Sequence, residues 1–397
     1  MKKRIILIVI LALLLISAPF IYHYYRIATA KKIVVLKKEK IVEVYSKVKI
    51  SEFIESINGK IEKDIYVDTS KVGKHIVNFT YTNDDHIKVE YSFEIKVVDT
   101  TPPIIGVSNK TVNTDYDGDL FKEFFCGDNY DDKPKCKIEG QYNTTTKGKY
   151  DLVFTAKDKS GNESSQSFTL TVKEKEPKKE TEQSTNPVYK KYEDVVKEYK
   201  NKNTMIGLDL SYWQGNIDFK KLKKNGVEFL FIRVGSENKE GEFFVDKKFE
   251  EYMKGAKENN IPVGIYYYSY ADSKSKAKKE AKWVIRQIKK YDVDLPVVFD
   301  WENWNHYRDY NLSFHSLTEV ADTFLETIEN AGYDGMLYSS KYYLENIWYP
   351  MKYQKWLAHY TTQTDYQGKY KVWQICSNGK IDGIPDNLVD IDIMLKK

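Results

Sequence analysis

The spacing of apolar residues changes along this chain, and the changes divide it into three regions. Residues 5–25 are an apolar run without Asp, Glu, Lys or Arg, and residues 31–173 contain stretches in which apolar and polar positions alternate. In residues 204–397, short apolar runs alternate with segments whose apolar residues recur at helical spacing. The first pattern predicts a membrane-spanning helix, the second half-buried strands, and the third strands alternating with amphipathic helices.

The region 204–397 is expected to be a parallel barrel, because strands and helices alternate regularly in it. The predicted strands cover residues 206–210, 229–234, 263–268, 297–301, 335–339, 355–359, 371–375 and 389–394. The predicted helices cover residues 217–225, 246–260, 275–291 and 317–331.

An internal repeat in the middle region predicts two tandem β-sandwich domains, residues 31–99 and 100–173. The matching positions, at one constant offset, are Gly73, Lys74, Phe79, Thr80, Phe93 and Val97 with Gly148, Lys149, Phe154, Thr155, Phe168 and Val172. The second copy, with Asp99-Thr-Thr-Pro-Pro103 and Lys157-Asp-Lys-Ser-Gly-Asn162, resembles the bacterial immunoglobulin-like surface modules. Residues 174–203 are expected to be a solvated linker that ends in a short helix.

Residues 1–30 are expected to be a short cytoplasmic tip and a transmembrane anchor. The apolar run 5–25 is long enough to cross a hydrocarbon core of ~30 Å, and Lys2, Lys3 and Arg4 precede it on the expected cytoplasmic side. This interpretation predicts a single-pass protein of the cell membrane with its C-terminal domains extracellular. The alternative is secretion after signal cleavage near Ala28-Thr-Ala30.

Composition limits the classes of partner that the chain is expected to bind. The chain has 397 residues, more than a single core usually supports, and 62 basic residues are nearly balanced by 58 acidic ones. Because the basic residues form no long block, nucleic-acid binding is not expected. No Cys/His spacing suggests a metal site, and no cofactor is predicted.

The three cysteines have different expected states. Cys126 and Cys136 lie close together in one predicted domain outside the cytoplasm, where disulfides persist, so a bridge between them is predicted. Catalysis is not expected to depend on this bridge, because it lies outside the barrel domain. Cys376 has no partner left and is expected to be a buried free thiol.

The candidate chemistry begins where the predicted strand 297–301 ends. Asp300 and Glu302 are two positions apart, so their side chains point the same way. Paired carboxylates of this kind are typical of glycosidases, in which one acid stays protonated while its neighbour stays ionised. The alternative is a solvated strand end. Asp209 and Asp390 lie on two other predicted strands, and crowding of these acids would raise at least one pKa.

Six segments in order resemble the family 25 glycoside hydrolases, the Chalaropsis-type lysozymes. They are Gly207-Leu-Asp-Leu-Ser-Tyr-Trp-Gln-Gly215, Phe229-Leu-Phe-Ile-Arg-Val234, Val263-Gly-Ile-Tyr-Tyr-Tyr268, Pro296-Val-Val-Phe-Asp-Trp-Glu302, Trp356-Leu-Ala358 and Val372-Trp-Gln374. The resemblance implies a modified (β/α) barrel with reduced later helices. It also implies that Glu302 donates the proton, that Asp300 stabilises the reacting sugar, and that Asp209 and Asp390 hold these two in place.

Aromatic side chains are expected to line the glycan cleft, since sugar rings expose apolar faces. The predicted substrate-binding residues are Tyr266, Tyr268, Tyr338, Trp356, Trp373 and Gln374. Asp392, two positions after Asp390, is expected to be an outer or lower side chain without a catalytic role.

The resemblance predicts a muramidase that hydrolyses the β-1,4 bond between N-acetylmuramic acid and N-acetylglucosamine. Its expected partners are peptidoglycan glycan strands and, through residues 5–25, the cytoplasmic membrane. Two alternatives remain open: a non-catalytic glycan-binding envelope protein, and a surface adhesin whose sandwich domains carry the function.

Overall fold

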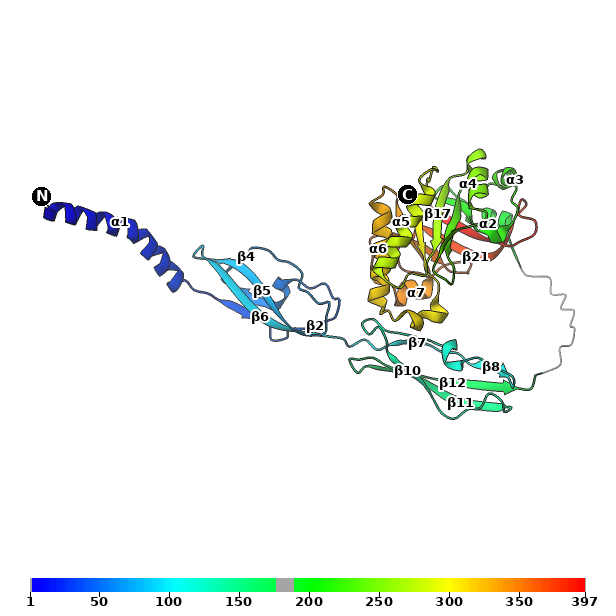
Figure 1. Cartoon of the computed structure of the whole chain (residues 1–397), viewed down its shortest axis with the longest axis horizontal. Helices are drawn as coiled ribbons and strands as arrows, with labels where there is room; N and C mark the ends of the chain where they lie inside the picture. Colours follow the sequence, from blue (N-terminus) through cyan, green and yellow to red (C-terminus); the bar gives the residue numbers. More distant parts are fainter. Residues whose placement is uncertain (1, 176–188, 397) are drawn as a thin grey trace. The chain divides into compact units, whose positions relative to one another are not determined.

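The computed structural model describes residues 2–175 and 189–396, without the side chains of residues 2–14. The chain separates into two compact units, Met1–Thr100 and Thr101–Lys397 (Figure 1). Residues 176–188 of the expected linker lie outside the described residues.

The first element is a helix, α1, over Lys2–Thr29. The prediction that it spans a membrane is wrong, and with it the predicted fold class: no helix in the described part of the chain is long and apolar enough to cross. Its described side chains begin at Leu15 and include Pro19, His23 and Arg26. The apolar stretch among these described side chains is therefore much shorter than the ~20 residues that a membrane-spanning helix needs. Residues 5–14 of the predicted span lie outside the described side chains.

The rest of the first unit is built from short strands and one long hairpin. A four-stranded sheet has the order β2-β6-β5-β4, and β1 pairs with β3 in a separate ladder. The bounds are β1 Val34–Leu36, β2 Ile41–Glu43, η1 Ile50–Phe53, β3 Ile54–Ile57, β4 Gly59–Ile61, β5 Gly73–Asn83 and β6 Lys88–Val98.

The second unit begins with a domain built in a similar way. Its four-stranded sheet has the order β10-β11-β12-β8, and β7 pairs with β9. The bounds are β7 Ile104–Gly106, β8 Lys110–Asn113, η2 Leu120–Glu123, β9 Phe125–Gly127, β10 Lys135–Glu139, β11 Gly148–Lys157 and β12 Glu163–Lys173.

The pairing explains the sequence repeat. Gly73 lies opposite Val97 in the β5–β6 hairpin, and Gly148 lies opposite Val172 in the β11–β12 hairpin. In both domains a short strand adds in parallel to the second strand of the hairpin. The repeated positions therefore set the register of equivalent hairpins.

The disulfide predicted between Cys126 and Cys136 is present, with Cα atoms 6.7 Å apart. It joins β9 to β10 and closes the loop between these strands. Cys376 is a buried free thiol, as predicted.

Eight strands of the remaining domain close into a barrel. Neighbouring strands from β14 to β21 run parallel along the ring, and β22 is antiparallel to both β21 and β14. The bounds are β14 Thr204–Leu210, β15 Leu230–Glu237, β17 Val263–Tyr268, β18 Val297–Asp300, β19 Gly335–Ser340, β20 Gln354–Ala358, β21 Val372–Lys380 and β22 Val389–Leu395. Two further strands, β13 Lys190–Lys191 and β16 Phe243–Val245, pair with β21 and β15.

The helices lie around the barrel strands in Figure 1, and their buried apolar faces form the outer core. They are α3 Phe219–Lys224, α4 Phe249–Glu258, α5 Lys274–Ile288, α6 Phe314–Glu329 and α7 Lys341–Asn346, with 3-10 turns η3 Tyr212–Gln214 and η4 Trp304–Tyr310. The later helices are reduced: α7 is short, and no helix stands between β20 and β22 in this described stretch. Every predicted barrel strand has a counterpart within a few residues.

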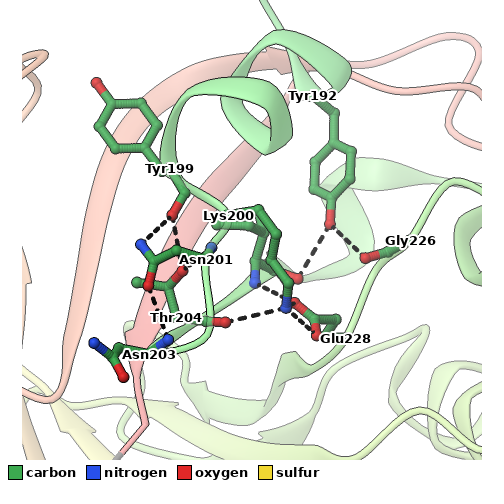
Figure 2. A network of polar contacts seen from close by, with 9 residues as sticks. Tyr192, Tyr199, Lys200, Asn201, Asn203, Thr204, Gly226 and Glu228 are labelled. Carbon is green, nitrogen blue, oxygen red and sulfur yellow. Dashed lines mark hydrogen bonds and ion pairs between the residues drawn. The ribbon is translucent and has the colours of Figure 1, made fainter.

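The short helix expected at the end of the linker belongs to the barrel domain. This helix, α2, covers Tyr192–Tyr199. Figure 2 shows the Tyr192 hydroxyl donating to the Gly226 carbonyl, at 3.2 Å, while Lys200 pairs with Glu228. Lys200 also donates to the Thr204 carbonyl at 3.0 Å. These bonds tie α2 to the entry of β14, so the barrel domain begins before residue 204.

We expect the Cys126–Cys136 bridge to stabilise its domain by about 2 to 3 kcal/mol, because it closes a short loop in the unfolded chain. Replacing both cysteines by serine should lower the free energy of unfolding of this domain by the same amount. Urea denaturation of the full chain measures this change. Wild-type protein treated with a reductant should match the variant. Peptide mapping that finds both thiols free in exported protein would contradict the bridge.

Candidate active site

The predicted acids meet at one end of the barrel. Asp300 is the last residue of β18, and Glu302 follows it by two positions. Asp209 of β14 lies directly opposite Asp390 of β22 in the antiparallel ladder. Electrostatic contacts link Asp209 to Asp390 and Asp300, and Asp390 to Glu302. Three separate strands therefore bring the four acids into one site.

Burial dominates the electrostatics of this site. It raises the pKa of Asp209 well above its ordinary value, the charge of Asp390 raises it further, and a hydrogen bond from Gln374 opposes the shift. Burial is likewise the first cause that raises the pKa of Asp390, to about 7, followed by the charge of Glu302. These carboxyl groups therefore keep their protons to a higher pH than solvent-exposed acids do.

Asp300 and Glu302 share a hydrogen bond. The pKa of Asp300 is raised first by burial and then by the charge of Glu302, while Arg233 lowers it. The pKa of Glu302 is also raised by the protein around its carboxyl group, although the side chain is open to solvent. The hydrogen bond raises the pKa of Asp300 and lowers that of Glu302. The two carboxyl groups are therefore close enough to share a proton, and Asp300 is the more deeply buried of the two.

Asp392 has an interior position that its sequence context did not reveal. It is fully buried, and its Oδ1 accepts a hydrogen bond from Trp356 Nε1 at 2.8 Å. Burial, and then the charge of Asp390, raises its pKa well above the ordinary value. Of the two expected positions, outer or lower, the outer one is excluded: Asp392 lies inside the barrel, in electrostatic contact with Asp390.

Gln374 connects the acids to two tyrosines. Its Nε2 donates to Asp209 Oδ2 at 2.8 Å, and its Oε1 accepts from the hydroxyls of Tyr338 and Tyr360, each at 2.9 Å. Because both ends of the amide are bonded, its orientation is defined and it holds Asp209 in one position. Gln374 is buried, so it acts through Asp209 rather than on an open surface.

Two predicted tyrosines lie beside the acids. Tyr266 is in electrostatic contact with Asp209 and Asp300, and Tyr268 with Asp300 and Glu302. Burial, the first cause in each case, raises the pKa of both hydroxyls. Both tyrosines therefore remain neutral hydrogen-bond donors at neutral pH.

Two tryptophans predicted to bind substrate do not reach the cleft. Trp356 is 2% exposed and stacks on Phe231 in the barrel interior, with ring centroids 4.5 Å apart. Trp373 donates to the His359 carbonyl at 2.8 Å and packs edge-on against Tyr199 of α2. The first supports Asp392 and the second packs in the outer core, so substrate binding by either tryptophan stays a prediction.

An open cleft of about 450 Å³ lies beside Glu302. Its walls are aromatic and polar, and they include Trp304, Tyr338, Tyr342, Tyr343 and Tyr360. Asn303 lines a second hollow of about 1150 Å³, together with Tyr270, Tyr310 and Lys276. Tyr342 and Tyr343 are wall residues that were not predicted from the sequence, and only their aromatic character hinted at this position.

Within the described residues of the barrel domain, no three carboxylate, imidazole or thiol ligands converge closely enough to hold a metal ion. The chemistry that the site offers is proton transfer and charge stabilisation by carboxyl groups. Acids at the carboxyl ends of barrel strands, beside an aromatic cleft, define a site of the glycoside hydrolase class.

Comparison with known proteins finds a match in this domain. Residues 208–384 match the family model described as glycosyl hydrolases family 25. Among relatives, YegX of Escherichia coli K12, an uncharacterized protein, is 30% identical over 191 residues, 46% of this chain and 66% of that protein. The autolytic lysozyme of Clostridium acetobutylicum is 25% identical over 191 residues, 47% of this chain and 55% of that protein.

Solved structures similar to the chain include a family 25 glycosyl hydrolase from Bacillus anthracis, with 24% identity and a TM-score of 0.43. The match covers 49% of this chain and 91% of that one. The spore cortex lytic enzyme SleM of Clostridium perfringens matches with 22% identity and a TM-score of 0.42, over 49% of this chain and 68% of that one.

The buried acids predict that stability falls as pH rises. The pKa of Asp392 is higher in the folded state than in the unfolded chain, so the folded protein binds this proton more tightly. Stability from this group is full below the unfolded value near 3.9 and is lost as pH rises through the folded pKa. The unfolding temperature should therefore fall less between pH 5 and pH 8 in Asp392→Asn than in the wild type. The expected difference is a few degrees, which corresponds to roughly 1 kcal/mol in the free energy of unfolding.

Calorimetry of the full chain measures this effect. Asp292→Asn is the matched control, since Asp292 is an exposed residue paired with Lys257. An unchanged pH dependence in Asp392→Asn would show that Asp392 does not hold an extra proton.

Proposed function

We propose that the barrel domain hydrolyses the β-1,4 bond between N-acetylmuramic acid and N-acetylglucosamine in peptidoglycan. The observation that carries this proposal is the Asp300–Glu302 pair, hydrogen-bonded, raised in pKa and placed beside an aromatic cleft. The family match over residues 208–384 and the likeness to an autolytic lysozyme support the same substrate.

Glu302 is the proposed proton donor to the leaving oxygen. It is the member of the acid pair that lines the open cleft, where the glycosidic oxygen can reach it. A sugar bound over Glu302 removes the water that stabilises its charge, so binding shifts the shared proton from Asp300 towards Glu302. The arrangement thereby prepares an acid at the bond to be broken.

Asp300 is the proposed stabiliser of the positive charge that develops on the reacting sugar. Once its proton moves to Glu302, Asp300 is an anion next to the cleft, where it also orients the N-acetyl group. A buried charge interacts strongly with a nearby oxocarbenium centre, because little water screens it.

Asp209 and Asp390 are proposed as positioning residues. Asp209 is fixed by Gln374, and Asp390 faces Asp209 across the ladder and contacts Glu302 electrostatically. Replacing either carboxyl group would change the protonation of the acid pair. Tyr266 and Tyr268 are proposed to donate hydrogen bonds to the substrate from the same end of the barrel.

We further propose that the protein acts outside the cytoplasm, where peptidoglycan lies. The Cys126–Cys136 disulfide supports this location, since such bridges persist in oxidising compartments. The domain 101–173 is proposed to be a diverged immunoglobulin-like module, supported by its paired sheets and its Lys157-to-Asn162 hairpin.

Glu302→Gln should reduce lysis of purified cell walls by about 100-fold or more while glycan binding survives. Glutamine keeps the size and hydrogen-bonding shape of the side chain but cannot deliver a proton. The assay is the loss of turbidity of cell walls treated with the full-length protein. Wild-type lysis by this variant would exclude Glu302 as the proton donor.

Asp300→Asn should also lower the lytic rate by about 100-fold, because the amide cannot supply the negative charge near the reacting sugar. The control is Asp292→Asn, a surface change in the loop before the same strand that leaves the site untouched. Asp294 is a poorer control, since its Oδ2 accepts the Val263 amide at 3.1 Å. Equal activity in Asp300→Asn and Asp292→Asn would refute the assignment.

A further inference from the structure

The disulfide-closed loop of the domain 101–173 contacts the barrel at the start of α6. The Phe314 amide donates to the Asp128 carbonyl at 2.8 Å, and the Ser313 amide donates to Asp132 Oδ1 at 2.9 Å. The Ser316 hydroxyl also donates to Asp132 Oδ1, at 3.4 Å. The first amides of a helix have no partner within the helix, and a carboxylate suits its positive end. One domain therefore caps a helix of the other.

Phe125 extends this contact into the aromatic core beneath the cleft. Its ring stacks on Phe314 at 6.2 Å between centroids and packs against Tyr307 at 5.3 Å. It also meets the rings of Trp304 and Tyr343, at 6.5 and 6.4 Å. Phe125 thus touches residues on three separate elements of the barrel.

Gly127 permits the close approach. A Cβ at this position would lie 2.6 Å from Phe314 and 2.7 Å from Tyr307, so no larger residue fits without displacing an aromatic ring. Gly127 directly follows Cys126, so the bridge and the close approach belong to the same short strand.

Arg308 forms a third contact between the domains. Its Nη2 donates to the Phe121 carbonyl at 2.6 Å, and its guanidinium lies over the Phe121 ring at 3.7 Å from the centroid. The electron-rich face of an aromatic ring attracts a cation, and the attraction is stronger where water is excluded. Arg308 lies within η4, so the domain 101–173 contacts this turn as well as the start of α6.

The segment held in this way is the one that leads out of the acid pair. The Trp304 amide donates to the Glu302 carbonyl at 2.7 Å, and the Trp304 ring stacks on Tyr343 at 3.7 Å. Both aromatic residues line the cleft beside Glu302. A shift of η4 would therefore move the backbone of Glu302 and one wall of the cleft.

We infer that the domain 101–173 is a positioning element for the proposed glycosidase site: Phe125 and the disulfide-closed loop hold residues 303–316 so that Glu302 keeps its productive geometry. The inference rests on the proposed function. It corrects the expectation that catalysis is independent of the bridge. A displacement of about 1 Å at a reacting group costs up to about 100-fold in rate, so a modest loosening is measurable.

Reduction of the bridge is then expected to lower the catalytic rate. A dithiol supplies the two electrons, is itself oxidised to a disulfide, and leaves Cys126 and Cys136 as thiols. The freed loop would hold Asp132 and the Asp128 carbonyl less firmly against α6. The same loosening follows when Phe125 is truncated.

The test uses the full-length protein and measures kcat and KM separately on soluble glycan strands. Phe125→Ala should lower kcat by about 10-fold with KM changed by less than about 2-fold, because positioning rather than binding is lost. Phe125→Leu should recover most of the rate. Tyr142→Ala is the control, an exposed aromatic residue of the same domain.

Two further readouts separate positioning from general instability. Hydrogen exchange of the amides in residues 303–316 should accelerate in Phe125→Ala but not in Tyr142→Ala. A dithiol should lower kcat of the wild type but not lower it further in a variant with Cys126 and Cys136 both replaced by serine.

The possible failures are distinguishable. Wild-type kcat in Phe125→Ala, with or without faster exchange, would overturn the positioning role while leaving the muramidase intact. An inactive wild-type protein on glycan strands from several sources would overturn the proposed function and this inference with it.

Discussion

The burial of carboxyl groups at one end of the barrel is the constraint on which the site depends. Asp209, Asp300 and Asp392 have almost no contact with water, and each has another acid as a neighbour. Such a group is costly to ionise, so protons stay in the site at a pH where free acids would be charged. Gln374 and Trp356 donate hydrogen bonds that fix two of these acids. The barrel thereby keeps protons among closely placed carboxyl groups, as the proposed acid-catalysed cleavage of a glycosidic bond requires.

Much of this arrangement follows from strand alternation. Asp300 and Glu302 share a face because they are two positions apart, and the predicted barrel strands lie close to the observed ones. Alternation tells which face a residue occupies, but not how deep it lies inside a closed barrel. For this reason alternation left two positions open for Asp392 and could not show that Trp356 is buried inside the barrel. Trp373 packs on Tyr199, and alternation cannot show this contact because Tyr199 lies far away in the sequence.

The contact between the domain 101–173 and the barrel was not predictable from pattern. The sequence pattern is that of ordinary core residues at Phe125, Tyr307 and Phe314. Nothing in their spacing shows that they are in contact across two domains. The prediction of a membrane-spanning helix is wrong because no helix in the described part of the chain is long and apolar enough to cross. Within the predicted span, the described side chains include Pro19 and His23, which interrupt the apolar run. By contrast, the disulfide was predictable because its cysteines are close in sequence and share one domain.

We propose that the acid pair at the end of β18 cleaves the bond on the reducing side of N-acetylmuramic acid. The decisive measurement is mass spectrometry of the fragments that the full-length protein and its Glu302→Gln variant release from purified peptidoglycan. We expect fragments with muramic acid at the reducing end, released by the wild type and nearly absent with the variant. Fragments ending in N-acetylglucosamine, or equal release by both proteins, would contradict it.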